Sequence, residues 1–394
     1  MEVKQIYTLI NSVSSEVLGK TDLVQEDLTG VVDLGNEIFN QNAVDNYVKS
    51  LVNHIGKVVF VNRPYSGKVP SVLMDAWEFG SVLEKISADV PQAEENDTWN
   101  LTDGTEYKQD VFHKPTVSAK FFNSKVTFEV PVSITERQVK ESFSSAAQLN
   151  GFLSMIYNAV EKSMTIKTDA LVMRTINNMI AETLDADKTA FGFVPSTNET
   201  VDYSTASTVR CVNLLRLYNE KTGTHLEADV AITTPDFIRY AAYIMGLYSD
   251  RLQTISTLFN VGGKERFTPK DVLHTVLLSD FAAAAKTYLY ADTFHEDNVL
   301  LPKAETVASW QATGKDYAFD NVSKIDVKSA SGATVSISGV LGVMFDRDAL
   351  GVTNLDKRVT TNYNAKAEFF NNYYKFDAGY FNDTNENFVV FFIA

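Results

Sequence analysis

The chain has 394 residues, 45% hydrophobic and 22% charged, so it can bury more than one apolar core and is not disordered over most of its length. The formal net charge of −15 at pH 7 argues against a nucleic-acid binder with a basic face, because such a face has to displace counterions from phosphates. The acidic balance does not exclude a container for DNA, since an acidic inner wall repels packed phosphates.

The single cysteine, Cys211, excludes an internal disulfide framework and fits a reducing cytosol, where we expect it to be a small buried apolar group. No basic-then-apolar leader opens the sequence. No apolar run approaches the ~20 residues that span a bilayer. The sequence therefore predicts neither a secretion signal nor a membrane anchor.

The N-terminal residues predict an arm rather than a domain. Helical spacing at Ile6, Ile10 and Val13 alternates with polar loops. Residues 57–61 have the β-branched content of a strand, which the turn-forming residues 63–67 end.

From Trp77 to Val132 the pattern changes. Residues 78–86 alternate, an acidic stretch follows at 89–103, and residues 111–117 and 125–132 predict two strands paired with each other across the polar break at 121–124. This excursion has too little aliphatic content for a core of its own, so we expect it to pack on something else.

Residues 135–183 predict one long helix. They contain no proline, and their apolar residues recur every three or four positions. If residues 144–182 were continuous, the helix would be roughly 58 Å long at 1.5 Å per residue. Residues 165–168 are a place where it could bend.

Residues 207–342 predict a compact α/β or α+β domain. Residues 208–218 have helical spacing and residues 229–233 resemble a short buried strand. Thr234-Pro235-Asp236 is a helix start signal that Thr268-Pro269-Lys270-Asp271 repeats, and residues 261–264 predict a flexible loop between them. Further strands are expected at residues 275–278, 287–290, 324–328, 334–337 and 340–345.

No catalytic, cofactor-binding or metal-binding residue is predicted. The histidines occur singly and without metal-ligand spacing, and the one local His/acid cluster, residues 295–297, is better explained as a solvated loop. Gly262-Gly263-Lys264 fails as a phosphate loop, because Leu258 stands where its first glycine belongs and Glu265 replaces the required Ser or Thr. The five histidines are His54, His113, His225, His274 and His295.

Asp346 and Asp348 are the remaining carboxylate pair. They flank Arg347 beside a strand end, and a structural salt bridge or turn is favoured over an acid/base pair. No Gly-x-Ser-x-Gly elbow and no cysteine with a partner motif is present, so no cofactor is expected.

The C-terminal 52 positions, residues 343–394, carry the most specific pattern. An apolar strand is followed by a polar connection, an aromatic-rich segment at residues 363–381, and a last apolar strand at residues 386–394. An apolar terminus is expected to be tied into a sheet or an interface. Core packing accounts for most of the aromatic residues, and subunit contact is the functional alternative.

This order of elements resembles a tailed-bacteriophage major capsid protein of the Hong Kong 97-type α+β fold, and is most similar to those of small short-tailed phages. The resemblance implies six parts: an N-terminal arm at 1–56, the peripheral domain begun at 57–76, an extended loop at 77–132, the spine helix and peripheral domain at 133–205, an axial domain at 206–342, and a peripheral return at 343–394.

The resemblance implies a structural protein with no active site. Copies would form pentamers and hexamers of an icosahedral shell around double-stranded DNA, with the arm and the loop overlapping adjacent subunits. The implied partners are the chain itself, a separate scaffolding protein, a portal protein and DNA bound without sequence-specific contact, with no membrane. The implied locations are the virion capsid and, during assembly, the host bacterial cytoplasm.

Two alternatives stay open on the sequence. An encapsulin-like compartment of the same fold would hold cargo enzyme instead of a genome. A soluble enzyme or binding domain would be a compact monomer, with a radius of gyration of about 21 Å.

Overall fold

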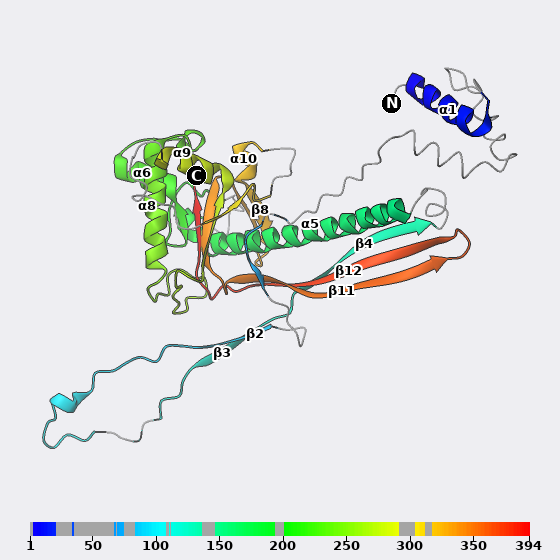
Figure 1. The fold of residues 1–394 in the computed structure, drawn as a ribbon. Helices are drawn as coiled ribbons and strands as arrows, with labels where there is room; N and C mark the ends of the chain where they lie inside the picture. The colour runs from blue at the N-terminus through cyan, green and yellow to red at the C-terminus, as the bar shows by residue number, and fades with distance from the viewer. Residues whose placement is uncertain are drawn as a thin grey trace. The chain divides into compact units, whose positions relative to one another are not determined.

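The computed structural model describes most of the chain in helices, strands and well-placed loops (Figure 1). The described residues are 3–20, 34, 67, 69–74, 83–107, 110, 112–135, 146–193, 201–290, 304–311 and 317–394. The predicted strand at 57–61 lies outside them. Within the arm, the expected helical character is confirmed by α1 (Val3–Leu18).

The chain divides into two compact units, and several long elements contribute residues to both. One unit contains residues 1–66, 129–165 and 358–375, and the other contains residues 67–128, 166–357 and 376–394.

The predicted long helix is confirmed as α5 (Ala146–Ala186), a single helix of 41 residues that continues through Thr165–Thr168 without a break. Thr165 Oγ1 donates to the carbonyl of Glu161, four residues earlier, so the threonine hydroxyl is satisfied inside the helix. The apolar positions of the predicted stripe are buried at Val160, Met164, Leu171, Ile176, Met179 and Ile180.

Four strands form a sheet in the order β1-β11-β12-β4. They are β1 (Leu73–Met74), β11 (Leu350–Asn364), β12 (Phe369–Asn382) and β4 (Lys125–Thr135). β1 runs parallel to β11 and pairs with Val352 and Thr353. Figure 1 shows β11, β12 and β4 as long neighbouring strands.

The larger unit is built on a five-stranded sheet in the order β5-β13-β10-β6-β7. Its strands are β5 (Cys211–Asn213), β13 (Phe388–Phe392), β10 (Val340–Asp346), β6 (Leu273–Leu278) and β7 (Glu305–Val307). Every residue of β13 and β10 is buried. The expectation that the apolar C-terminal segment joins a sheet is therefore confirmed.

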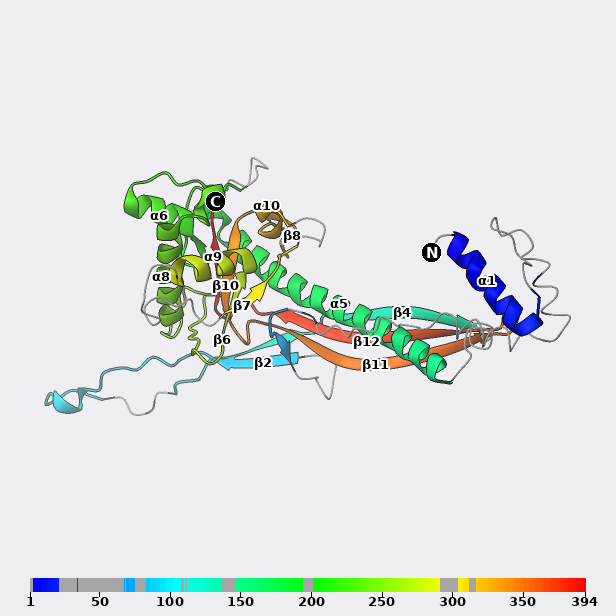
Figure 2. The same cartoon turned by 45° about the horizontal axis from the view of Figure 1, so that its top comes forward.

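Helices and short elements of the same unit surround this sheet. α9 packs on α8, β6 and β7 (Figure 2). The elements are α6 (Leu214–Thr222), α7 (Ala228–Ala231), α8 (Pro235–Arg251), α9 (Ser279–Tyr290), α10 (Phe319–Val322), the hairpin of β8 (Ile325–Lys328) and β9 (Thr334–Ile337), and the 3-10 turn η2 (Lys188–Phe191). A second 3-10 turn, η1 (Asp97–Trp99), lies away from the sheet, in the segment between β2 and β3.

The aromatic C-terminal residues belong mostly to this core. Phe391 packs edge-on against Tyr248 of α8 with ring centroids 5.3 Å apart, and Phe392 contacts Phe191 and Tyr203. Core packing thus explains the aromatic residues of β13, whereas Tyr363 and Phe370, which contact each other, are 43% and 39% exposed.

The predicted pairing of the strands in the excursion is wrong. β3 (Val117–Phe122) pairs antiparallel with β2 (Leu83–Ala88), while β4 pairs with β12. The sequence showed two neighbouring β-rich segments separated by a polar break. Cross-strand partners are chosen by tertiary packing, so adjacency in sequence predicted the wrong partner here.

Four further local predictions are wrong. Residues 211–213 within the predicted helix at 208–218 form β5, and only its end belongs to a helix, α6, which begins at Leu214. Residues 229–231 of the predicted strand at 229–233 belong to the short helix α7. Residues 287–290 are the last turn of α9, not a strand. The second start signal, at Thr268, is followed by β6 instead of a helix, because the apolar run that follows fits a buried strand as well as a helix.

Candidate assembly surfaces

The hairpin of β2 and β3 presents an unusual pair of faces. Three of its large apolar residues point outward, with Ile86 67%, Val117 58% and Phe121 63% exposed, whereas Leu83 and Phe122 lie on the opposite face. Its lysines Lys85 and Lys120 lie on the other, half-buried face. A hairpin normally turns its apolar face to its own core. This reversal leaves an apolar face available to a partner.

Lys85 and Lys120 stand directly opposite each other in the hairpin register, where like charges repel. Asp383 neutralises both, with Oδ2 at 2.7 Å from Nζ of Lys85 and Oδ1 at 3.0 Å from Nζ of Lys120. Glu386 adds a second carboxylate at 3.2 Å from Lys85 and is also paired with Arg266 at 3.2 Å. We call these five residues the loop-root cluster.

The side chain of Asp383 is 3% exposed, so its charge depends on these partners. Burial raises the pKa of a carboxylic acid, but the hydrogen bonds and charges of Lys85 and then Lys120 outweigh it. They hold the pKa of Asp383 below its ordinary value of 3.8. The turn also fixes the carboxylate, since the N–H of Asn385 donates to Asp383 Oδ1 at 3.1 Å. The cluster therefore anchors the hairpin with charged groups, next to the packing of Phe122 on Phe381, whose ring centroids are 5.2 Å apart.

Beyond the hairpin, residues 89–107, 110 and 112–116 are irregular chain apart from η1 (Figure 1). Close to the root, Asp89 accepts from Lys264 Nζ at 3.0 Å. Further out, large apolar side chains are exposed: Trp99 by 94%, Leu101 by 66% and Phe112 by 86%. Large apolar groups on an irregular segment mark an interaction surface, since their exposure to water is unfavourable.

Asp346 and Asp348, the carboxylate pair noted in the sequence, lie in one turn. Asp346 is 8% exposed; its Oδ2 accepts from Thr268 Oγ1 at 2.8 Å and its Oδ1 accepts from the N–H of Asp348 at 2.9 Å. Both carboxylate oxygens of Asp346 therefore accept hydrogen bonds that fix this turn, as the structural interpretation predicted.

The loop that contains Gly262 and Gly263 is held by hydrogen bonds within the protein. Asn260 brackets it, donating from Nδ2 to the carbonyl of Lys264 at 2.7 Å and accepting from the N–H of Lys264 at 2.8 Å. Cys211 is fully buried, and burial raises its pKa well above the ordinary value.

Among the residues that the structure describes, no group of three or more His, Cys, Asp or Glu side chains could hold a metal ion. His54 and His295 lie outside those residues. The face of His274 stacks on Phe345 with centroids 5.4 Å apart. Within the same part of the chain, no helix is long and apolar enough to cross a membrane.

Sequence reasoning missed the loop-root cluster. The only signals were two lysines in neighbouring β-rich segments and two acids in the turn before the last strand, far away in sequence. Nothing in their spacing indicates that they meet.

Comparison with solved structures shows a similar fold. The capsid of Staphylococcus phage Andhra has a similar fold, with a TM-score of 0.52, 9% identity, and coverage of 86% of this chain and 87% of that chain. A structure from bacteriophage P68, described as head fiber and inner core protein gp22, gives a TM-score of 0.46 at 10% identity, with coverage of 86% and 89%. No curated protein sequence matches.

The family model for Phi29-like phage major capsid proteins matches residues 9–392, nearly the whole chain. The predicted Hong Kong 97-type α+β fold and the structural role in a phage capsid shell are confirmed. The match does not favour the encapsulin-like compartment or the soluble enzyme. The chain belongs to the Phi29-like phage major capsid protein family.

Proposed function

We propose that copies of this protein form pentamers and hexamers that tile an icosahedral shell around double-stranded DNA, and that the extended loop makes the contact between neighbouring copies. The observation that carries the proposal is the set of exposed apolar side chains from Ile86 to Phe121, above all Trp99 at 94% and Phe112 at 86% exposure. A second copy would cover this surface.

The anchoring of the loop supports this role. A contact made by an irregular segment is weak when the segment has to be ordered on binding, because ordering costs conformational entropy. The loop-root cluster fixes both strands at the base of the loop, so less of this cost falls on assembly. Repetition over many copies then makes a weak single contact sufficient for a closed shell.

The proposed division of labour follows the six parts given above. The axial domain at 206–342 meets its copies around the local symmetry axes, and the arm at 1–56 and the loop at 77–132 overlap adjacent subunits. A separate scaffolding protein and a portal protein take part, and assembly takes place in the host bacterial cytoplasm. The packaged DNA is enclosed without sequence-specific contact, and the subunit carries out no catalysis.

Expression of the chain with and without a candidate scaffolding protein, followed by negative-stain electron microscopy, tests the proposal. Rings, tubes or closed shells are expected. Monodisperse monomers under all conditions would contradict it. Small-angle scattering provides a second measurement, because an unassembled subunit with an extended loop should exceed the radius of gyration of about 21 Å expected for one compact body of this length.

A further inference from the structure

The hairpin of β2 and β3 depends on the rest of the larger unit for its stability. Its strands pair with each other from Leu83–Phe122 to Ala88–Val117, and within the described residues neither pairs with a third strand. A two-stranded hairpin alone in water is marginally stable at best. The contacts at its base therefore decide how often it separates from the unit, because an element held by few contacts opens without global unfolding.

Both strands of the hairpin reach the turn of residues 383–386. The N–H of Glu386 donates to the carbonyl of Asp383 at 3.2 Å, which closes this turn. Besides its bond with Asp383, Lys120 Nζ donates to Thr384 Oγ1 at 3.3 Å. Lys85 Nζ donates to the carbonyl of Asp348 at 2.9 Å in addition to its two carboxylates. The turn thus holds one ammonium group from each strand.

The segment of residues 260–266, which we call the glycine loop, supports the same turn. The N–H of Gly262 donates to the carbonyl of Thr384 at 2.8 Å. A Cβ atom added at Gly262 would overlap with Oδ1 of Asn385, so glycine is required for this close approach. The glycines that failed as a phosphate-loop motif in the sequence therefore have a packing role beside the loop root.

The glycine loop also joins the turn to the chain that leaves the hairpin. Its Arg266 pairs with Glu386 of the turn at 3.2 Å. Its Lys264 pairs at 3.0 Å with Asp89, the residue that follows β2. The hairpin is therefore held at its base by the turn and at its exit by the glycine loop.

The charges at these two places balance only while the carboxylates are ionised. Four cationic groups, Lys85, Lys120, Lys264 and Arg266, face the three carboxylates of Asp89, Asp383 and Glu386. Neutralising Asp383 and Glu386 would leave the four cations with one carboxylate, and like charges repel strongly where water is scarce. Two nearby acids do not compensate, because Glu84 lies on the exposed face of β2 and the carboxylate of Asp348 pairs with Arg347.

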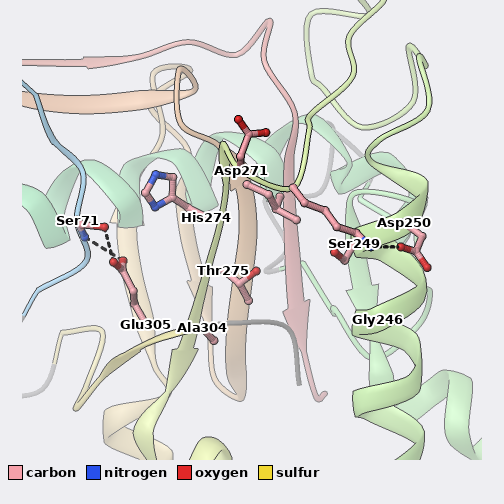
Figure 3. A pocket seen from close by; sticks show the side chains of 11 residues that line it. Ser71, Gly246, Ser249, Asp250, Asp271, His274, Thr275, Ala304 and Glu305 are labelled. Carbon is pink, nitrogen blue, oxygen red and sulfur yellow. Dashed lines mark hydrogen bonds and ion pairs between the residues drawn. The ribbon is translucent and has the colours of Figure 1, made fainter. Parts of the chain in front are cut away.

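An exposed ion pair of the same unit provides a comparison. Lys270 and Asp250 are 2.9 Å apart beside a cavity of about 640 Å³, and their side chains are 64% and 67% exposed (Figure 3). Water screens such a pair, so its loss changes stability little. Asp383 is only 3% exposed, so water does not replace its lysines.

We propose that the turn of residues 383–386 and the glycine loop form an ion-pair latch, which releases the hairpin of β2 and β3 from a still folded five-stranded sheet when Asp383 and Glu386 lose their charge. The folded subunit then has two states, with the hairpin docked or released. The inference goes beyond the proposed function and does not depend on it, because every group of the latch lies in one copy.

Hydrogen exchange of the full-length, unassembled subunit tests the release. The pH is lowered stepwise from about 6 to about 2.5, through the range in which carboxylates titrate. Protection factors, corrected for the intrinsic exchange rate, are compared between the hairpin and β13. Protection of residues 83–88 and 117–122 is expected to fall roughly tenfold while β13 stays protected. Loss of protection in both regions at the same pH would overturn the inference.

Removal of both lysines should invert this pH dependence. In the double variant Lys85→Met and Lys120→Met, Asp383 stays buried without its cations, so burial raises its pKa and protonation favours the docked hairpin. Protection of the hairpin should be roughly tenfold below that of the original protein at pH 6 and should rise as the pH falls. A fall or a flat profile would contradict the latch.

The matched control makes the same two chemical changes at exposed lysines. Lys114→Met and Lys270→Met together should leave the pH profile of the hairpin as it is in the original protein, because Lys114 is exposed in the loop and Lys270 belongs to the exposed pair. An inverted profile in this control would show that lysine removal in general, and not the latch, causes the effect.

Charge exchange tests the part of the glycine loop. Asp89→Lys and Lys264→Asp should each lower hairpin protection at pH 6 roughly threefold, since this pair is partly exposed. The double variant should return to within about twofold of the original value, because the pair is restored with its signs exchanged. Unchanged protection in both single variants would remove the glycine loop from the latch. These measurements need no shells, so a failure to assemble contradicts the proposed function alone.

Discussion

The five-stranded sheet and the extended loop use the same kinds of apolar residue in opposite ways. In β13, Phe388, Phe391 and Phe392 are at most 1% exposed. In the loop and its hairpin, Trp99 and Phe112 are exposed almost completely. Under the proposed function, the apolar groups that stabilise the fold and those that contact a neighbouring copy lie in separate regions, since an exposed side chain gains its burial energy only when a partner covers it.

The two regions also differ in how they are fixed. Packing of buried aromatic rings holds the sheet, whereas ion pairs at Asp383 and Glu386 hold the root of the loop together with the contact of Phe122 with Phe381. Both kinds of anchor lie on the face of the hairpin opposite to Ile86, Val117 and Phe121, so those three apolar side chains stay exposed. The following substitutions and pH measurement test this difference between the two regions, in order of their expected effect on the subunit's stability.

Phe391→Ala should lower the free energy of unfolding by about 3–5 kcal/mol, because it removes a fully buried ring and leaves a cavity beside Tyr248. Urea unfolding of the unassembled subunit measures the loss. Phe112→Ala is the matched control, with the same chemical change at an exposed ring, and should shift stability by less than about 0.5 kcal/mol. Equal losses in the two variants would show that the loop contributes to the subunit core.

Asp383→Asn should cost about 1–3 kcal/mol, because Lys85 and Lys120 would then face each other without a neutralising charge. Hydrogen exchange of residues 83–88 and 117–122 should accelerate, while exchange in β13 stays slow. Asp326→Asn on exposed β8 serves as the control. Uniform acceleration across the sheet would mean that Asp383 supports the whole core and not the hairpin.

The pH dependence of stability should follow the same carboxylate. The pKa of Asp383 is lower in the folded subunit than its ordinary 3.8, so its contribution is present above the unfolded pKa and is lost as the pH falls through the folded pKa. The melting temperature should fall on acidification, and less steeply in Asp383→Asn. Identical pH profiles for the two proteins would contradict the assignment.

Trp99→Ser should have the smallest effect on folding, within about 0.5 kcal/mol, because the indole is 94% exposed. Its effect on assembly should be the largest of the loop substitutions, since it removes the largest exposed apolar side chain. Thr98→Ser, at the preceding position, is the control. Sedimentation separates shells from subunits. A normal yield of shells from Trp99→Ser would show that the indole takes no part in the contact between copies.

The sequence predicted best where one strong pattern governs a long segment. The stripe of α5 and the apolar run of β13 were identified because periodicity over many residues, or a continuous apolar run, has few structural solutions. The local predictions failed in short segments. Residues 229–231, within the strand predicted at 229–233, and residues 287–290 are helical, because a few residues carry too little periodicity to decide between a buried helix and a strand.

The sequence by itself determined the absence of a recognised catalytic motif, the family resemblance, the long helix, the acidic excursion and the apolar C-terminal strand, since these depend on composition and local order. The tertiary structure alone decided which strand pairs with β3 and that Asp383 bridges two facing lysines. These features join residues separated by tens to hundreds of positions. Only the folded chain brings their charges and hydrogen-bonding groups within contact distance.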